Sequence, residues 1–142
     1  MALHKELPVY KLAYDLFSLS MDLTRNMPRD VKTSLGNRLR DACLEVIVLV
    51  GRANAALDKT PHLTLLLEHL QVGEILLRLA HDKKFISHAQ YARSVQVTDS
   101  VGAQVGGWRK AMAARMAEAP PALPADPMQG NLFGGPATAV PQ

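Results

Sequence analysis

Lysine and arginine gather in two short stretches of this 142-residue chain, around positions 25–32 and 78–84. Their side chains can bind phosphate groups, which requires only outward-facing cations at the spacing of a nucleic-acid backbone. The candidate phosphate contacts are Arg25, Arg29, Lys32, Arg38, Arg78, Lys83 and Lys84. The alternative is an ordinary solvated surface, in which some of these residues interact with the carbonyl groups at helix C-termini.

The positive charge of the chain is unevenly distributed. The net charge is +3, but the residues from Glu118 onward include two acids and no lysine or arginine, so 16 basic residues face 11 acidic ones before that point. This excess favours a polyanionic partner. The three tyrosines, Tyr10, Tyr14 and Tyr91, are few for stacking on bases. We therefore expect binding to RNA or DNA through shape and charge, with weak sequence preference.

Residue patterns typical of catalysis or of metal binding are absent from the sequence. A di-iron bundle needs a histidine three residues after a glutamate, whereas Gln71 follows Glu68 and Leu77 follows Glu74. The five histidines form no i, i+4 pair, and phosphate-binding glycine loops are missing. The single cysteine, Cys43, lies among apolar residues and is predicted to be a buried core residue. The sequence thus predicts a binding protein with no catalytic residue, cofactor or metal.

Apolar residues recur at helical spacing in four segments that could position the basic residues. The predicted helices run from Pro8 to Asn26, from Asp30 to Leu57, from Pro61 to His81, and from an N-cap at Ser87 to Ala117. Asp30 and Thr60 are predicted as further N-caps. Short links make consecutive helices antiparallel, so the fold class is an all-α, up-down-up-down four-helix bundle over residues 1–117. Residues 118–142 hold six of the nine prolines and are predicted to be a disordered tail.

Two apolar runs point to self-association. Val46–Val50 spans more than one helical turn and Leu65–Leu67 nearly does, whereas a four-helix monomer buries one stripe per helix. A second apolar face would remain, so we expect a homo-oligomer. Neither run approaches the length of about 20 residues that a membrane helix needs. The N-terminus also lacks the apolar core of a signal peptide, so a cytoplasmic protein without a membrane partner is expected.

Three stretches resemble a known family: Leu-Pro-Val-Tyr-Lys-Leu-Ala-Tyr-Asp-Leu (7–16), Met-Pro-Arg-Asp-Val-Lys-Thr-Ser-Leu-Gly-Asn-Arg-Leu (27–39) and Gly-Gly-Trp-Arg-Lys (106–110). Residues 7–112 resemble the four-helix-bundle family of the accessory variability determinant (Avd) of diversity-generating retroelements. The resemblance implies a basic, barrel-like pentamer that binds a reverse transcriptase and associates with template RNA or its DNA copy. Such a protein supports mutagenic retrohoming while the reverse transcriptase performs the chemistry.

Two other readings stay open beside this one. The Avd family is related to the bundle protein encoded within intervening sequences of 23S ribosomal RNA genes, whose role is unknown. The second open reading is a structural adaptor protein whose basic charge is incidental.

The tail carries one further motif. Gln129–Phe133 places a glutamine three residues before a Leu-Phe pair, which resembles the peptide by which bacterial replication and repair proteins dock on the sliding clamp. The alternative is a chance match in a low-complexity segment.

Overall fold

Proline marks the start of three helices in the computed structural model, which describes residues 7–118. Helix α1 (Pro8–Arg25) begins at a proline, helix α2 (Arg29–Val31) follows Pro28, and helix α4 (Thr60–Asp82) carries Pro61 in its first turn. Proline fits these positions because the N–H groups of a first helical turn have no partner within the helix.

Two of the three predicted N-caps are wrong. Asp30 and Thr60 both lie inside helices, and the N-cap positions are Pro28 and Lys59. The Asp58 carboxylate, two residues before the predicted cap, accepts the Thr60 N–H at 3.1 Å.

The cap at Ser87 is confirmed, and it starts helix α5 (His88–Glu118). Ser87 Oγ accepts the Gln90 N–H at 3.0 Å, and Gln90 Oε1 accepts the Ser87 N–H at 2.8 Å. This reciprocal pair is a capping box, which satisfies two N–H groups that the helix itself leaves without acceptors.

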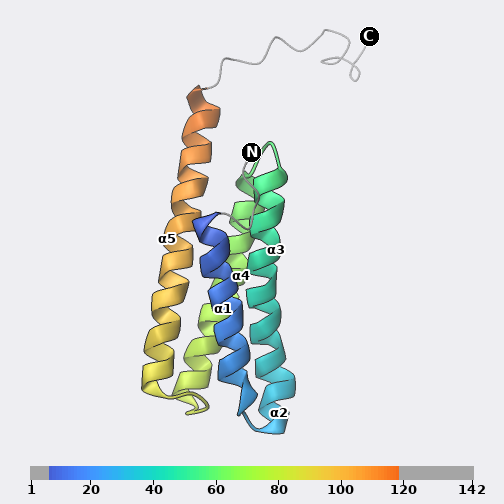
Figure 1. Cartoon of the computed structure of the whole chain (residues 1–142), viewed down its shortest axis with the longest axis vertical. Coiled ribbons are helices and arrows are strands. Elements are labelled where there is room, and N and C mark those ends of the chain that lie inside the picture. The colour runs from blue at the N-terminus through green and yellow to red at the C-terminus, as the bar shows by residue number, and fades with distance from the viewer. Residues whose placement is uncertain (1–6, 119–142) are drawn as a thin grey trace, which may run out of the picture.

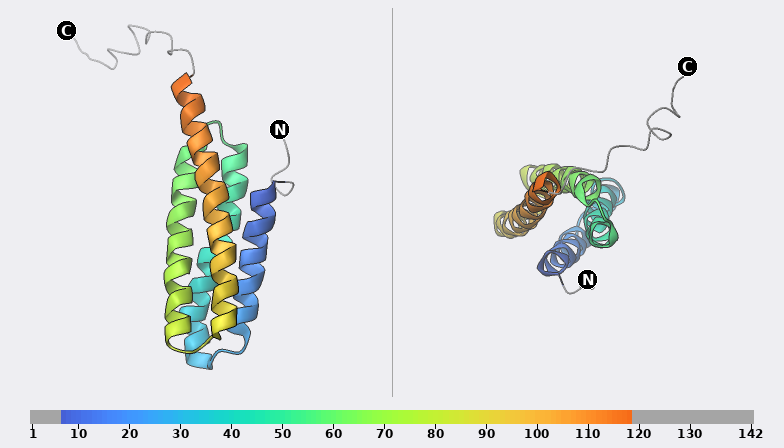
Figure 2. Two further views of the ribbon diagram at one scale, coloured as in Figure 1. Left: turned by 90° about the vertical axis from the view of Figure 1, so that its left-hand side faces the viewer. Right: turned by 90° about the horizontal axis from the view of Figure 1, so that it is seen from above.

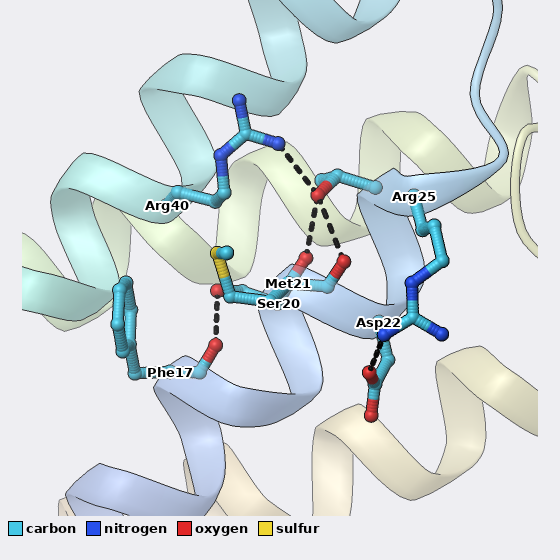
Figure 3. A network of polar contacts seen from close by, with 7 residues as sticks. Phe17, Ser20, Met21, Asp22, Arg25 and Arg40 are labelled. Atoms are coloured by element: carbon cyan, nitrogen blue, oxygen red, sulfur yellow. Dashed lines mark hydrogen bonds and ion pairs between the residues drawn. The ribbon is translucent and has the colours of Figure 1, made fainter.

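The second predicted helix is continuous but contains a π-helical turn. Helix α2 leads into η2 (Lys32–Gly36) and then into α3 (Asn37–Ala55). A Cβ atom on Gly36 would lie 3.4 Å from the Thr24 methyl group, so glycine allows this turn to lie close to α1. One turn further on, Arg40 donates to the buried Thr24 hydroxyl at 2.8 Å, and that hydroxyl donates to the Ser20 carbonyl at 2.9 Å (Figure 3). This network joins α1 to α3.

The four long helices form the predicted up-down-up-down bundle (Figures 1 and 2). Helices α3 and α5 each lie against both α1 and α4, and α5 extends beyond the other three at its C-terminal end. The largest fully buried side chains are aliphatic: Leu16, Leu39, Val46, Leu49, Val50, Leu63, Leu66, Val101 and Val105. Cys43 is buried among them as predicted, and burial raises its pKa to about 12 despite a hydrogen bond with Ser20 that lowers it.

The run Val46–Val50 does not form the second apolar face that the sequence suggested. Three of its residues are fully buried, and Ile47 packs against the same core. Large exposed apolar side chains lie elsewhere, and apart from Leu57 in the α3–α4 link and Met116 on α5 we divide them into two groups. The first group is Tyr14 and Met21 on α1 and Leu44 on α3, and the second is Leu65, Ile75 and Leu79 on α4.

In the part of the chain that the structure describes, no helix has the length and apolar character needed to cross a membrane. Helix α5 continues to Glu118, one residue beyond the predicted end of the bundle. The remainder of the predicted tail, including the Gln129–Phe133 motif, lies outside the described residues.

Candidate nucleic-acid interface

Two connections meet at one end of the bundle. There α1 ends, α2 begins, and α4 turns into α5 (Figures 1 and 2). Six of the seven predicted phosphate contacts belong to these elements, and we refer to them together as the basic end. They are Arg25, Arg29, Lys32, Arg78, Lys83 and Lys84.

Only two residues of the basic end take part in ion pairs. Arg25 lies 2.7 Å from an Asp22 carboxylate oxygen, and Arg78 lies 3.7 Å from Asp82. Both pairs are solvent-exposed, and such pairs contribute little to stability, so a phosphate can compete for either arginine. The other four make no ion pair with any residue between 7 and 118. The basic end therefore offers uncompensated positive charge.

Lys84 has an unusual backbone conformation. Its φ is 65°, the only positive value among non-glycine residues of the described chain. Phe85 donates its N–H to the Ala80 carbonyl at 2.8 Å, and Lys84 donates to the His81 carbonyl at 3.0 Å. These two bonds form a Schellman motif, in which glycine is usual at the left-handed position. A lysine there costs about 1 kcal/mol relative to glycine, so this position carries a lysine at the expense of stability.

Arg38 does not belong to the basic end. It lines a groove between α3 and α4 together with Asp41, Glu45, His69 and Val72, and the groove has a volume of about 210 Å³. Two carboxylates in the same groove offset its charge, although Arg38 forms no ion pair with either. The structure thus separates Arg38 from the other six candidates.

Two further basic residues stabilise the fold through hydrogen bonds that residue spacing did not predict. Arg40 donates to Thr24, as described above, and to the Asn37 side chain. The Lys59 ammonium group donates to the carbonyls of Ala53 and Ala56 at 3.0 and 2.8 Å, and so caps the C-terminus of α3. Neither cation is free to bind phosphate.

Two histidines meet at the α4–α5 turn, although no two of the five are spaced as an i, i+4 pair in the sequence. His81 Nε2 and His88 Nδ1 lie 3.3 Å apart, although seven residues separate them in the chain. The His81 ring also stacks on Tyr91, with a centroid distance of 4.5 Å. Only the turn geometry brings these rings together, so a search at helical spacing misses the pair. One face of Tyr91 is covered by His81 and cannot stack on a base.

One carboxylate of α4 and one of α5 line the same cavity. Glu74 and Asp99 line a small cavity of about 160 Å³ with Tyr91, Ser94 and Thr98. Burial, and then the charge of Asp99, raise the pKa of Glu74 above its usual value. Residues 7–118 contain no cluster of three histidine, cysteine, aspartate or glutamate side chains arranged to hold a metal ion.

Replacing Glu74 with glutamine is expected to raise the melting temperature at pH 7 and to leave it unchanged at pH 4. A carboxyl group with a raised folded-state pKa destabilises the fold in its charged form. This loss of folding free energy is absent below the unfolded-state pKa of 4.5. It grows as the pH rises from there and is complete above the folded-state pKa. Thermal unfolding followed by circular dichroism at both pH values tests this. A lower melting temperature for the variant at pH 7 would contradict the expectation.

Comparison with known proteins identifies a family. No curated protein matches the chain. The sequence model of one family, described as bAvd-like, matches residues 7–112. The match covers all four long helices except the last turns of α5, and it therefore includes every element of the basic end. The chain belongs to the bAvd-like family.

Proposed function

We propose that this protein is a non-catalytic accessory protein of a diversity-generating retroelement, which binds nucleic acid and a partner reverse transcriptase. Family membership supports the accessory role, because the family resemblance implies a bundle that assists a reverse transcriptase. The observation that carries the nucleic-acid part is the basic end, where four cations remain without ion pairs among the described residues. The proposed nucleic acids are the template RNA and its DNA copy.

The exposed apolar side chains support assembly into a ring. Tyr14 is 56% exposed and Met21 is 47% exposed on α1, while Ile75 on α4 is 60% exposed. The two groups lie on different helices, so contact between the first group of one copy and the second group of the next would be head-to-tail. Such head-to-tail contacts generate closed rings when the rotation closes. We propose a homo-oligomer of this kind, a pentamer by analogy with the family.

A ring would repeat the basic end around its axis. Each copy then contributes its own unpaired cations to one surface, and the phosphate contacts multiply with the number of copies. Counterion release from each contact makes the affinity fall steeply as the salt concentration rises.

Fluorescence anisotropy with labelled single-stranded RNA and DNA of mixed sequence tests the proposal. We expect binding at 50 mM salt and, for roughly six phosphate contacts, an affinity about 1,000-fold lower at 200 mM salt. Two unrelated sequences of equal length should bind within a few-fold of each other. Lack of binding at low salt, or an affinity that does not depend on salt, would refute nucleic-acid binding by the basic end. Co-purification with the reverse transcriptase tests the protein partner separately.

A further inference from the structure

Two imidazole rings meet where α4 turns into α5. His81 lies in the last turn of α4 and His88 is the first residue of α5. The backbone between them is fixed at both ends, by the Schellman motif at Lys84 and by the capping box at Ser87. The His81 ring is further held by Tyr91, on which it stacks with an interplanar angle of 23°. The pair is therefore ordered before any ligand binds.

Asp82 determines which nitrogen of His81 carries the proton. The Asp82 Oδ1 atom lies 3.2 Å from His81 Nδ1, and a carboxylate accepts hydrogen bonds, so Nδ1 is the protonated nitrogen of the neutral ring. The lone pair on Nε2 then points toward His88. A carboxylate on the far nitrogen of a histidine is the usual support for a metal-ligating ring, because it fixes the tautomer and makes the ligating nitrogen more basic.

The distance between the two facing nitrogens fits a metal ion. Zinc binds imidazole nitrogen at about 2.0–2.1 Å with tetrahedral geometry, which places two such nitrogens about 3.3–3.4 Å apart. The observed separation of Nε2 and Nδ1 is 3.3 Å. Without a metal, an N–H···N hydrogen bond donated by His88 accounts for the same distance. A metal ion would lie beside the line that joins the two nitrogens, and the His88 proton would be released to solvent. We infer that His81 and His88 form a binding site for a divalent transition-metal ion such as Zn²⁺.

The site has two protein ligands and an open side. No third histidine, cysteine or carboxylate of residues 7–118 completes the coordination. The rings adjoin a hollow of about 790 Å³ whose wall also includes Lys84, Phe85 and Ser87, so solvent fills the other positions. A zinc site with two protein ligands binds far more weakly than one with four. We expect a dissociation constant on the order of 10 µM for this site. The exposed lysines nearby oppose a dication, and the Asp82 carboxylate offsets part of that repulsion.

Isothermal titration of the full-length protein with Zn²⁺, in a buffer without phosphate or nucleic acid, tests the site. We expect one ion per chain and at least a 10-fold loss of affinity in His88→Ala. The exposed His88 side chain can be removed without opening the core, and circular dichroism verifies that the variant is folded. The matched control is His62→Ala, because His62 lies near the other end of α4 and should leave the affinity unchanged.

The Asp82→Asn variant separates a metal site from a simple histidine pair. Losing the carboxylate support should weaken zinc binding by about 10-fold while both ligands remain. If the wild-type protein takes up no zinc at 100 µM, or if His88→Ala binds it as tightly as the wild type, the inference is wrong. Since no nucleic acid is present, either failure leaves the proposed nucleic-acid binding untouched.

Discussion

Replacing Ile75 with aspartate should convert the proposed ring of several copies into single chains of 15.5 kDa. Ile75 is 60% exposed on the outer side of α4, between the partly exposed Leu65 and Leu79. A carboxylate buried in an apolar interface without a partner carries a large desolvation cost. The same carboxylate stays hydrated on the surface of a monomer and carries no desolvation cost there. The variant should therefore stay folded while the ring dissociates. Light scattering coupled to gel filtration measures the mass directly.

Leu57→Asp is the matched control. Leu57 is 96% exposed in the link between α3 and α4, outside both apolar groups, and its replacement should leave the mass of the assembly unchanged. Circular dichroism shows whether each variant retains its helices. A wild-type protein that already runs as a monomer at micromolar concentration would refute the ring. So would a folded Ile75→Asp variant with the wild-type mass.

A head-to-tail interface also predicts that the apolar group on α1 and α3 is as important for assembly as the group on α4. Met21→Asp on α1 should dissociate the ring as Ile75→Asp does, because Met21 belongs to the surface that would receive α4 of the next copy. An interface in which α4 meets α4 of a partner would instead give a dimer that Met21→Asp does not affect. The pair of variants therefore distinguishes a ring from a two-fold assembly.

The bundle itself could be predicted from the sequence because its signals are local and redundant. Apolar residues at helical spacing, prolines in first turns and short links all point to antiparallel helices, and the structure agrees. The cap at Ser87 was predictable because Gln90 follows it at capping-box spacing. At Asp30 the prediction failed because the helix begins directly after Pro28, and at Thr60 because the Asp58 carboxylate accepts the Thr60 N–H and the helix begins one residue earlier than predicted.

The details of the candidate sites depend on geometry that the sequence pattern does not carry. The π-helical turn at Lys32–Gly36 shifts the phase of the helix, and nothing in the local pattern of residues signals it. The contact between His81 and His88 depends on a left-handed residue in the turn, at a lysine instead of the expected glycine. The sequence could place Arg25 and Lys83 at one end, and Arg38 apart from them on the long second helix. It could not show that Arg38 shares a groove with two carboxylates, because that depends on how α3 packs against α4.

Lys84→Gly should make the protein more stable and, at the same time, weaken its binding to nucleic acid. Glycine adopts a φ of 65° without strain, so the folded state should gain about 1 kcal/mol, which raises the melting temperature by about 4 °C. Losing the ammonium group removes one phosphate contact per copy, which should lower the slope of log affinity against log salt by about 1 per contact. Lys84 is thus predicted to lower the stability of the fold and to strengthen its binding to nucleic acid.

Two companion variants make the Lys84→Gly result decisive. Lys84→Ala removes the same charge but keeps the left-handed strain, so it should weaken binding without stabilising the fold. Lys83→Ala also removes a cation, from a residue with an ordinary φ of −86°, and should likewise bring no stabilisation. If Lys84→Gly is stabler but binds RNA and DNA like the wild type at every salt concentration, Lys84 is not a phosphate contact. If it binds more weakly and is no stabler, the left-handed turn is not strained. The result that agrees with a phosphate-binding lysine at a position that favours glycine is a gain in stability together with a loss of affinity in Lys84→Gly, and no gain in stability in either alanine variant.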